Sequence, residues 1–148
     1  MKGRRWLAAG LIAAGLVLAG CEQGESGKND EKPARVIKAQ GSEVSRVVLT
    51  QKAADRLGIK TQNVREMQAP DGSAPGLAVP VAALLYDEAG ATWVYTTTEP
   101  LTYVRYRVTV ARIDGDVANL RSGPPAGTAV VTVGAAELLG SENGVEGE

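Results

Sequence analysis

The clearest pattern along the chain is an alternation of side-chain types in TYVRYRVTVARI, residues 102–113. One set of alternate positions is apolar and the other is mostly polar; the first contains Val104, Tyr106, Val108 and Val110, and the second contains Tyr103, Arg105, Arg107 and Thr109. A period of two is typical of a β-strand with one buried and one solvent-exposed face. The segment therefore predicts a long strand whose arginine side faces water.

Shorter runs rich in apolar and β-branched residues predict partners for this strand. They cover residues 44–49, 59–65, 81–86, 92–98, 117–121 and 129–133. Turn residues separate them, with tight hairpins at 87–90 and at Asp114-Gly115 and wider loops at 66–76 and 122–128. Seven strands joined in this way indicate an antiparallel sheet.

One short helix is predicted after the first strand. Thr50 can cap its start through the hydroxyl group, and Ala53, Ala54 and Leu57 recur at helical spacing. Gly58 supplies the positive φ at which helices commonly end. Residues 134–140 are expected to form a further helical turn. The fold class is mainly β: a small antiparallel β-barrel-like or rolled sheet of about seven strands with one short α-helix.

The chain begins with a segment of a different kind, MKGRRWLAAGLIAAGLVLAGC. A basic start is followed by an apolar run that is too short for a permanent membrane span, and small residues precede Cys21. This resembles a bacterial lipoprotein signal with its lipobox, which implies a signal peptide at 1–20 and lipidation of Cys21. An ordinary secretory signal is the alternative, but the chain's single cysteine lies at the cleavage motif.

Composition divides the remaining chain into three parts. Residues 21–43 are polar and predict a flexible tether, because such a segment cannot bury enough apolar surface to offset its ordering entropy. Residues 44–140 are the expected folded domain, and 141–148 a disordered tail. The lipid would hold the domain on the extracytoplasmic side of the cell membrane or the outer membrane.

The side chains that are missing exclude several kinds of chemistry. The sequence has no histidine, and its one cysteine is assigned to the anchor, so the usual general base, thiol nucleophile and Cys/His metal site are absent. Removal of residues 1–20 would take three of the 16 basic residues and leave 13 against 17 acidic ones. This balance argues against nucleic acid as a partner. We expect no enzymatic activity, cofactor or metal.

Two groups of charged residues remain as candidate sites. Asp114 and Asp116 could share a cation or act as an acid/base pair, but a hairpin turn is the favoured interpretation. Tyr103, Arg105 and Arg107 could dock an acidic partner or phospholipid headgroups, and a solvated strand face remains the alternative.

The order of motifs resembles a known family. LAVPVAALLYDEAGATWVYT, YVRYRVTV and IDGDVANLRSGPPAGTAVVTVGAAEL are similar to the end of periplasmic adaptor subunits of tripartite efflux pumps, also called membrane fusion proteins. The matching positions are Val79, Pro80, Ala83, Gly90, Val94, Val108, Gly123, Gly127, Val130, Val131 and Gly134. Pro124 stands where the family usually has leucine, and Thr128 where an acidic residue is frequent.

The earlier segment VVLTQKAADRLGIKTQNV resembles the start of heavy-metal-type adaptors. In those proteins both chain ends fold together into the membrane-proximal domain, with further domains between them; here only residues 66–76 stand between. The resemblance implies a non-enzymatic accessory protein that docks on transporter or adaptor subunits. A small-ligand or cell-envelope binding lipoprotein is the alternative, and a hydrolase is the weakest hypothesis.

Overall fold

The computed structural model describes residues 32–38, 44–68 and 75–144. The predicted signal peptide, Cys21, residues 145–148 and most of the predicted tether lie outside the described residues. Within the described ranges, no helix combines the length and the apolar character that crossing a bilayer requires.

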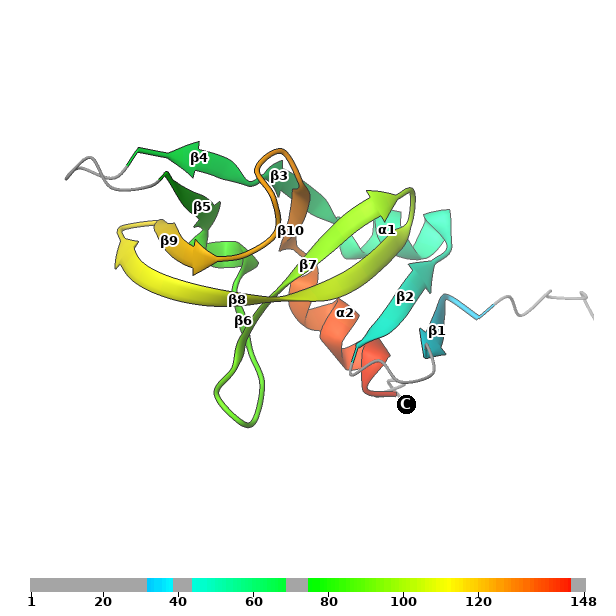
Figure 1. Ribbon diagram of the computed structural model, residues 1–148. Coiled ribbons are helices and arrows are strands. Elements are labelled where there is room, and N and C mark those ends of the chain that lie inside the picture. Colours follow the sequence, from blue (N-terminus) through cyan, green and yellow to red (C-terminus); the bar gives the residue numbers. More distant parts are fainter. Residues whose placement is uncertain (1–31, 39–43, 69–74, 145–148) are drawn as a thin grey trace, which may run out of the picture. The chain divides into compact units, whose positions relative to one another are not determined.

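Ten strands, two α-helices and one 3-10 helix lie within these ranges (Figure 1). The strands are β1 (Ala34–Lys38), β2 (Ser45–Leu49), β3 (Lys60–Asn63), β4 (Arg65–Met67), β5 (Gly76–Pro80), β6 (Leu85–Tyr86), β7 (Thr92–Glu99), β8 (Thr102–Asp114), β9 (Val117–Ser122) and β10 (Ala129–Val133). The helices are α1 (Gln51–Leu57), the 3-10 helix η1 (Val81–Ala83) and α2 (Ala135–Glu142).

The strands form a nearly closed antiparallel barrel-like sheet, so the predicted fold class is confirmed. Its order is β3-β10-β7-β8-β9-β5-β4, and β3 and β4 are consecutive in the chain. They meet at Val64, whose N–H donates to the carbonyl of Thr128 at 2.9 Å. The carbonyl of Val64 accepts from Gly127 at 2.8 Å. These two bonds extend the pairing of β3 with β10 and hold the junction of the two edge strands beside the segment that leads into β10.

Segments from both sides of the 66–76 connection belong to this one sheet. β2 pairs with β8, β3 pairs with β10 and β4 pairs with β5, all antiparallel. The expectation that residues 44–65 pack into the same sheet system as residues 79–133 is therefore confirmed. Part of the predicted loop is itself a hairpin, since β4 and β5 take up both of its ends.

Buried apolar residues form two clusters. The barrel cluster fills the inside of the sheet with Val64, Val79, Ala83, Val94, Val108, Ala118, Leu120 and Val130. The outer cluster lies between β2, the other face of the β7–β8 ribbon and the two α-helices, and contains Val47, Leu49, Ala53, Ala54, Tyr95, Tyr103, Val131, Ala135 and Leu138.

Helix α1 has the predicted limits. The Thr50 hydroxyl accepts from the N–H of Ala53 at 3.2 Å, and Gly58 ends the helix at φ 61°. Ala53 and Ala54 are buried and Leu57 packs on the outer cluster, as their spacing predicts.

Both predicted ends of the folded domain were wrong. Residues 34–38, placed in the tether, form β1, which pairs along its whole length with β2. The run ARVIK has five residues and lies between polar segments, so its pattern was too short to predict a strand. At the other end, α2 continues through Glu142, which the prediction had placed in the tail and which is buried.

Two further predictions were wrong in detail. Residues 81–86 begin with η1, because the N–H of Leu84 turns back to the carbonyl of Val81 at 3.0 Å, and only β6 is a strand. Along β8, Tyr103 is buried and Tyr106 is exposed, the reverse of the predicted faces. The reason is that β8 is shared: its first residues pack on the outer cluster and Val108 packs in the barrel cluster.

Candidate functional site

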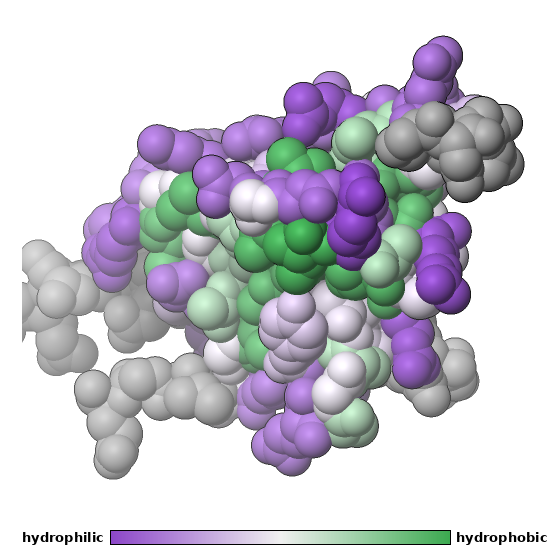
Figure 2. Space-filling view, turned by 90° about the vertical axis from the view of Figure 1, so that its left-hand side faces the viewer, coloured by the Kyte–Doolittle hydropathy of each residue, from purple (hydrophilic) through white to green (hydrophobic). Residues whose placement is uncertain are grey.

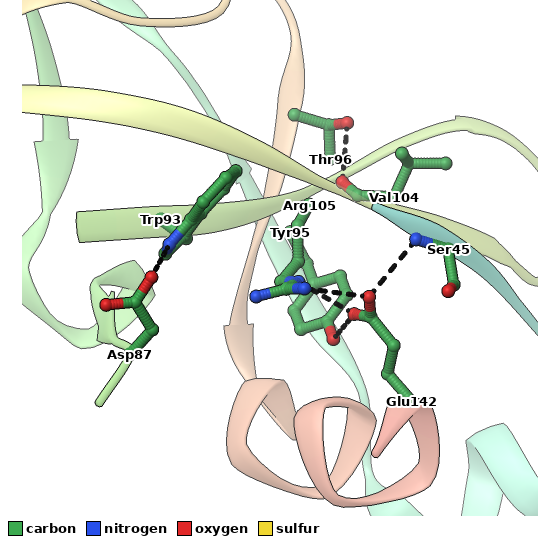
Figure 3. A network of polar contacts seen from close by, with 8 residues as sticks. All are labelled: Ser45, Asp87, Trp93, Tyr95, Thr96, Val104, Arg105 and Glu142. Atoms are coloured by element: carbon green, nitrogen blue, oxygen red, sulfur yellow. Dashed lines mark hydrogen bonds and ion pairs between the residues drawn. The ribbon is translucent and has the colours of Figure 1, made fainter. Parts of the chain in front are cut away.

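A buried ion pair joins the long strand to the C-terminal helix (Figure 3). Arg105 on β8 and Glu142 at the end of α2 expose only 14% and 4% of their side chains. Nη2 of Arg105 donates to Oε1 of Glu142 at 3.0 Å, and Nε lies 2.8 Å from Oε2 without the alignment of a hydrogen bond. This carboxylate neutralises the arginine where water has little access.

Two more donors complete the surroundings of the Glu142 carboxylate. The hydroxyl of Tyr95 on β7 donates to Oε2 at 2.6 Å, and the N–H of Ser45 on β2 donates to Oε1 at 3.1 Å. Burial raises the pKa of Tyr95, and the bond to Glu142 raises it further. The network therefore connects β2, β7, β8 and α2 through one carboxylate, and its clearest role is structural.

Trp93 lies beside this network on the same face of β7. The guanidinium carbons of Arg105 and Arg107 are 4.9 Å and 5.7 Å from its ring centre, which are cation–π distances. Its ring N–H donates to Oδ2 of Asp87 at 2.9 Å, while the N–H of Ala91 donates to Oδ1 at 2.7 Å. The bond from Trp93, followed by the one from Ala91, lowers the pKa of Asp87. The indole is therefore held at its ring N–H by Asp87, and the guanidinium groups of Arg105 and Arg107 lie over its ring.

The three predicted docking residues do not form one surface. Tyr103 is buried in the outer cluster, and this burial raises the pKa of its hydroxyl. Arg105 is occupied by Glu142, so Arg107 is the one of the three with an exposed side chain. A docking role for these residues stays a prediction, and its exposed part is Arg107 above Trp93.

The Asp114/Asp116 pair occupies the predicted hairpin turn. Gly115 between the two residues has φ 55°, a value that favours glycine. Asp114 pairs with Arg112 and accepts from the side chain of Asn119 at 3.1 Å. Across the described ranges, no three His, Cys, Asp or Glu side chains are grouped as metal ligands. These contacts fit the predicted hairpin turn.

Sequence reasoning missed Glu142 and Ser45 as members of the polar network, and Asp87 as the partner of Trp93. For Glu142 a signal was available: Ala135, Leu138 and Glu142 follow one another at steps of three and four, so they share one helix face. That face is the buried one. For Ser45 no local signal exists, because its contribution is a backbone N–H.

A second surface lies on the side of the domain away from β1 and β2. Figure 2 shows apolar side chains gathered in a band there, bordered by hydrophilic ones. In Figure 1 this side is formed by β4, β5, β9 and the end of β8. The strands here carry exposed or half-buried large apolar residues: Met67, Leu77, Val110 and Ile113. Apolar surface of this kind, with a polar border, is typical of protein interaction sites.

The fold and these surfaces define a small antiparallel β-barrel-like domain with a buried polar cross-link and two candidate contact faces. No protein-family model matches the chain. No curated protein matches it either.

Among solved structures, the chain is similar to the NMR structure of a 180-residue fragment that contains the N-terminal metal-binding site and the membrane proximal domain of SilB from Cupriavidus metallidurans CH34. The identity is 25%, the TM-score is 0.43, and the match covers 53% of this chain and 42% of that one. The chain therefore spans less than half the length of the protein fragment it matches.

Proposed function

We propose that this protein is a non-enzymatic, lipid-anchored extracytoplasmic protein that docks on a membrane transport complex of the efflux type. The observation that carries the proposal is the closure of the sheet across the 66–76 connection, with β2 on β8 and β3 on β10. The sequence segments that meet there are the two that resemble the ends of periplasmic adaptors. The two segments pair directly, without the domains that adaptors carry between these ends.

The proposed anchor rests on the sequence of the first 21 residues. A basic start, a short apolar run and small residues before Cys21 are the features of a lipoprotein signal. Attached acyl chains would hold the protein at a membrane, because each buried methylene contributes about 0.8 kcal/mol.

The side chains that the sequence lacks favour a binding role. The sequence has no histidine, and its one cysteine is the proposed lipidation site. The carboxylates that were candidates, Asp114 and Asp116, lie in a hairpin turn where Arg112 and Asn119 engage the first of them. This arrangement favours docking over turnover.

Two surfaces are suited to a protein partner. Arg107 is exposed above an indole that Asp87 holds in place, so it presents a cation on a rigid support. The side of the domain formed by β4, β5, β9 and the end of β8 presents the apolar band of Figure 2. Ile113, near the end of β8, is exposed, so a partner could remove apolar surface from water there.

Photo-cross-linking in living bacteria of the source species tests the proposal. A photoreactive amino acid replaces Arg107 or Ile113 in the full chain, and Lys52, an exposed cation on α1, serves as the control position. We expect a component of a transport complex among the products from position 107 or 113 and not from position 52. Recovery of no transport component from either test position contradicts the proposal.

A further inference from the structure

The sheet continues beyond the barrel into a flap made of β1 and β2, and one face of this flap points away from the helices. In register, Ile37 of β1 lies opposite Arg46 of β2, and Arg46 lies opposite Val104 of β8. In the next row, Arg35 lies opposite Val48. We call the face that carries these residues the flap face.

The other side of the flap is the one that packs on the helices. Along β2, Val47 and Leu49 alternate with Arg46 and Val48. Val47 and Leu49 belong to the outer cluster, together with residues of α1 and α2. Because successive side chains of a strand point to opposite faces, the flap face is the side that the helices do not cover.

Cationic and apolar side chains are mixed on the flap face. Arg35, Ile37 and Arg46 are exposed, and Val48 and Val104 are half-buried. Tyr106, two residues after Val104 and on the same face of β8, is 44% exposed, as is Ile37. Of the three basic residues in β1 and β2, Arg35 and Arg46 lie on this face, whereas Lys38 lies on the other; neither strand contains an acidic residue.

The flap is also the described structure nearest in sequence to the proposed anchor. Ala34, the first residue of β1, follows Cys21 by thirteen positions. A chain of that length can extend over at most about 45 Å, and a flexible chain of that length has a typical reach of about 20 Å. A lipid on Cys21 would therefore keep β1 close to the headgroups.

From these observations we propose that the flap face rests on an anionic lipid surface, with Arg35 and Arg46 on the headgroups and Ile37 and Tyr106 at the interface. The inference rests on the anchor part of the proposed function. Guanidinium groups attract anionic headgroups and pair with their phosphates, while a tyrosine presents an apolar body with a polar tip. A membrane is favoured over an acidic protein because the short segment after the proposed anchor leads directly to β1. This strand carries Arg35 and Ile37 of the flap face.

A solvent-sensitive fluorophore on single cysteines tests this assignment. The full chain is produced in bacteria with Ile37→Cys or Tyr106→Cys, purified with its lipid, labelled and placed in vesicles. Lipidation would block Cys21, so the introduced thiol becomes the labelled one. Val133→Cys on β10 is the matched control, since Val133 is 43% exposed and lies outside the flap.

With vesicles in which about a third of the phosphatidylcholine is replaced by phosphatidylglycerol, we expect a blue shift and brighter emission at positions 37 and 106. Position 133 should not change. The shift at position 37 should be lost with Arg35→Gln and Arg46→Gln together, and in about 1 M salt, where the screening length falls to about 3 Å. The matched double variant Lys52→Gln and Arg56→Gln on α1 should keep it.

The assignment is overturned if position 37 behaves like position 133, if pure phosphatidylcholine gives the same shift, or if only an acidic protein produces it. A wrong anchor proposal can be told apart from a wrong flap-face assignment, because mass spectrometry then finds no lipid on the chain. In that case Cys21→Ser is added so that position 37 carries the one thiol, and the labelled protein is mixed with preformed vesicles. A shift at position 37 that depends on phosphatidylglycerol still supports the assignment.

Discussion

The two buried clusters of this domain are built on different principles. The barrel cluster is aliphatic, and its eight buried members are valines, alanines and one leucine. The outer cluster contains two tyrosines and adjoins the ion pair of Arg105 and Glu142. The buried side chains of the first cluster are all apolar, whereas the second cluster also adjoins a buried polar network.

The two clusters are expected to lose stability in different ways when a side chain is replaced. An aliphatic cluster loses contacts gradually when a side chain is shortened. A buried ion pair leaves an uncompensated charge when one partner is removed. The clusters meet at the β7–β8 ribbon, where alternate residues serve one cluster or the other: Val94 the barrel and Tyr95 the outer cluster.

The largest effect is expected from Glu142→Ala. It leaves Arg105 buried without its carboxylate and should lower the free energy of unfolding by about 3–5 kcal/mol. Urea unfolding measures the loss. Glu137→Ala, at an exposed position of the same helix, should change stability by less than about 0.5 kcal/mol. Equal stability of the two variants would show that the pair is not buried in solution.

Shortening one leucine in each cluster tests whether the two clusters unfold together. Leu120→Ala in the barrel cluster and Leu138→Ala in the outer cluster should each cost roughly 2–5 kcal/mol. Both should retain one transition in urea with coincident fluorescence and circular dichroism signals. Two separate transitions in the Leu138→Ala variant would mean that the outer cluster unfolds on its own.

A smaller effect is expected at the junction of β10 and α2. Gly134 has φ 88°, and a Cβ there would collide with Ile59 Cδ1, so Gly134→Ala should cost about 1–3 kcal/mol. Gly140→Ala within α2 meets no neighbour and should stabilise by about 0.5–1 kcal/mol. Thermal unfolding of both variants measures the difference, and the same sign of change in both would contradict the described backbone.

The smallest effect concerns the Tyr95 hydroxyl. Tyr95→Phe removes the bond to Glu142 and should cost about 1 kcal/mol at neutral pH. Because folding raises the pKa of Tyr95, its stabilising effect is complete below the ordinary tyrosine range and is lost as pH rises above about 10. The difference between wild type and variant, measured by urea unfolding at several pH values, should shrink in that range. A constant difference would mean that Tyr95 is solvated.

The sequence predicted the barrel well because its signals are local. Turn residues and runs of β-branched side chains locate most strands of the sheet, and Thr50 and Gly58 mark the limits of α1. Which face of β8 is buried could not be predicted, because one strand serves two clusters on opposite sides.

The polar network of the candidate site could not be predicted from local pattern. Glu142 bonds to Ser45 and Arg105, which are 97 and 37 positions away in the chain. Such partners are determined by how the sheet closes and not by spacing. For the same reason Arg105 was expected on an exposed docking face together with Arg107, although only Arg107 is exposed.

The central claim is that the parts of the chain before and after the β4–β5 connection form one folding unit. Native-state hydrogen exchange in increasing urea measures this directly at the amides of Val47, Val64 and Val130. We expect the three amides to converge on the same free energy of opening, because β2, the β3–β4 junction and β10 all belong to one continuous hydrogen-bonded sheet. A markedly lower opening free energy for Val47 and Val64 than for Val130 would contradict the account.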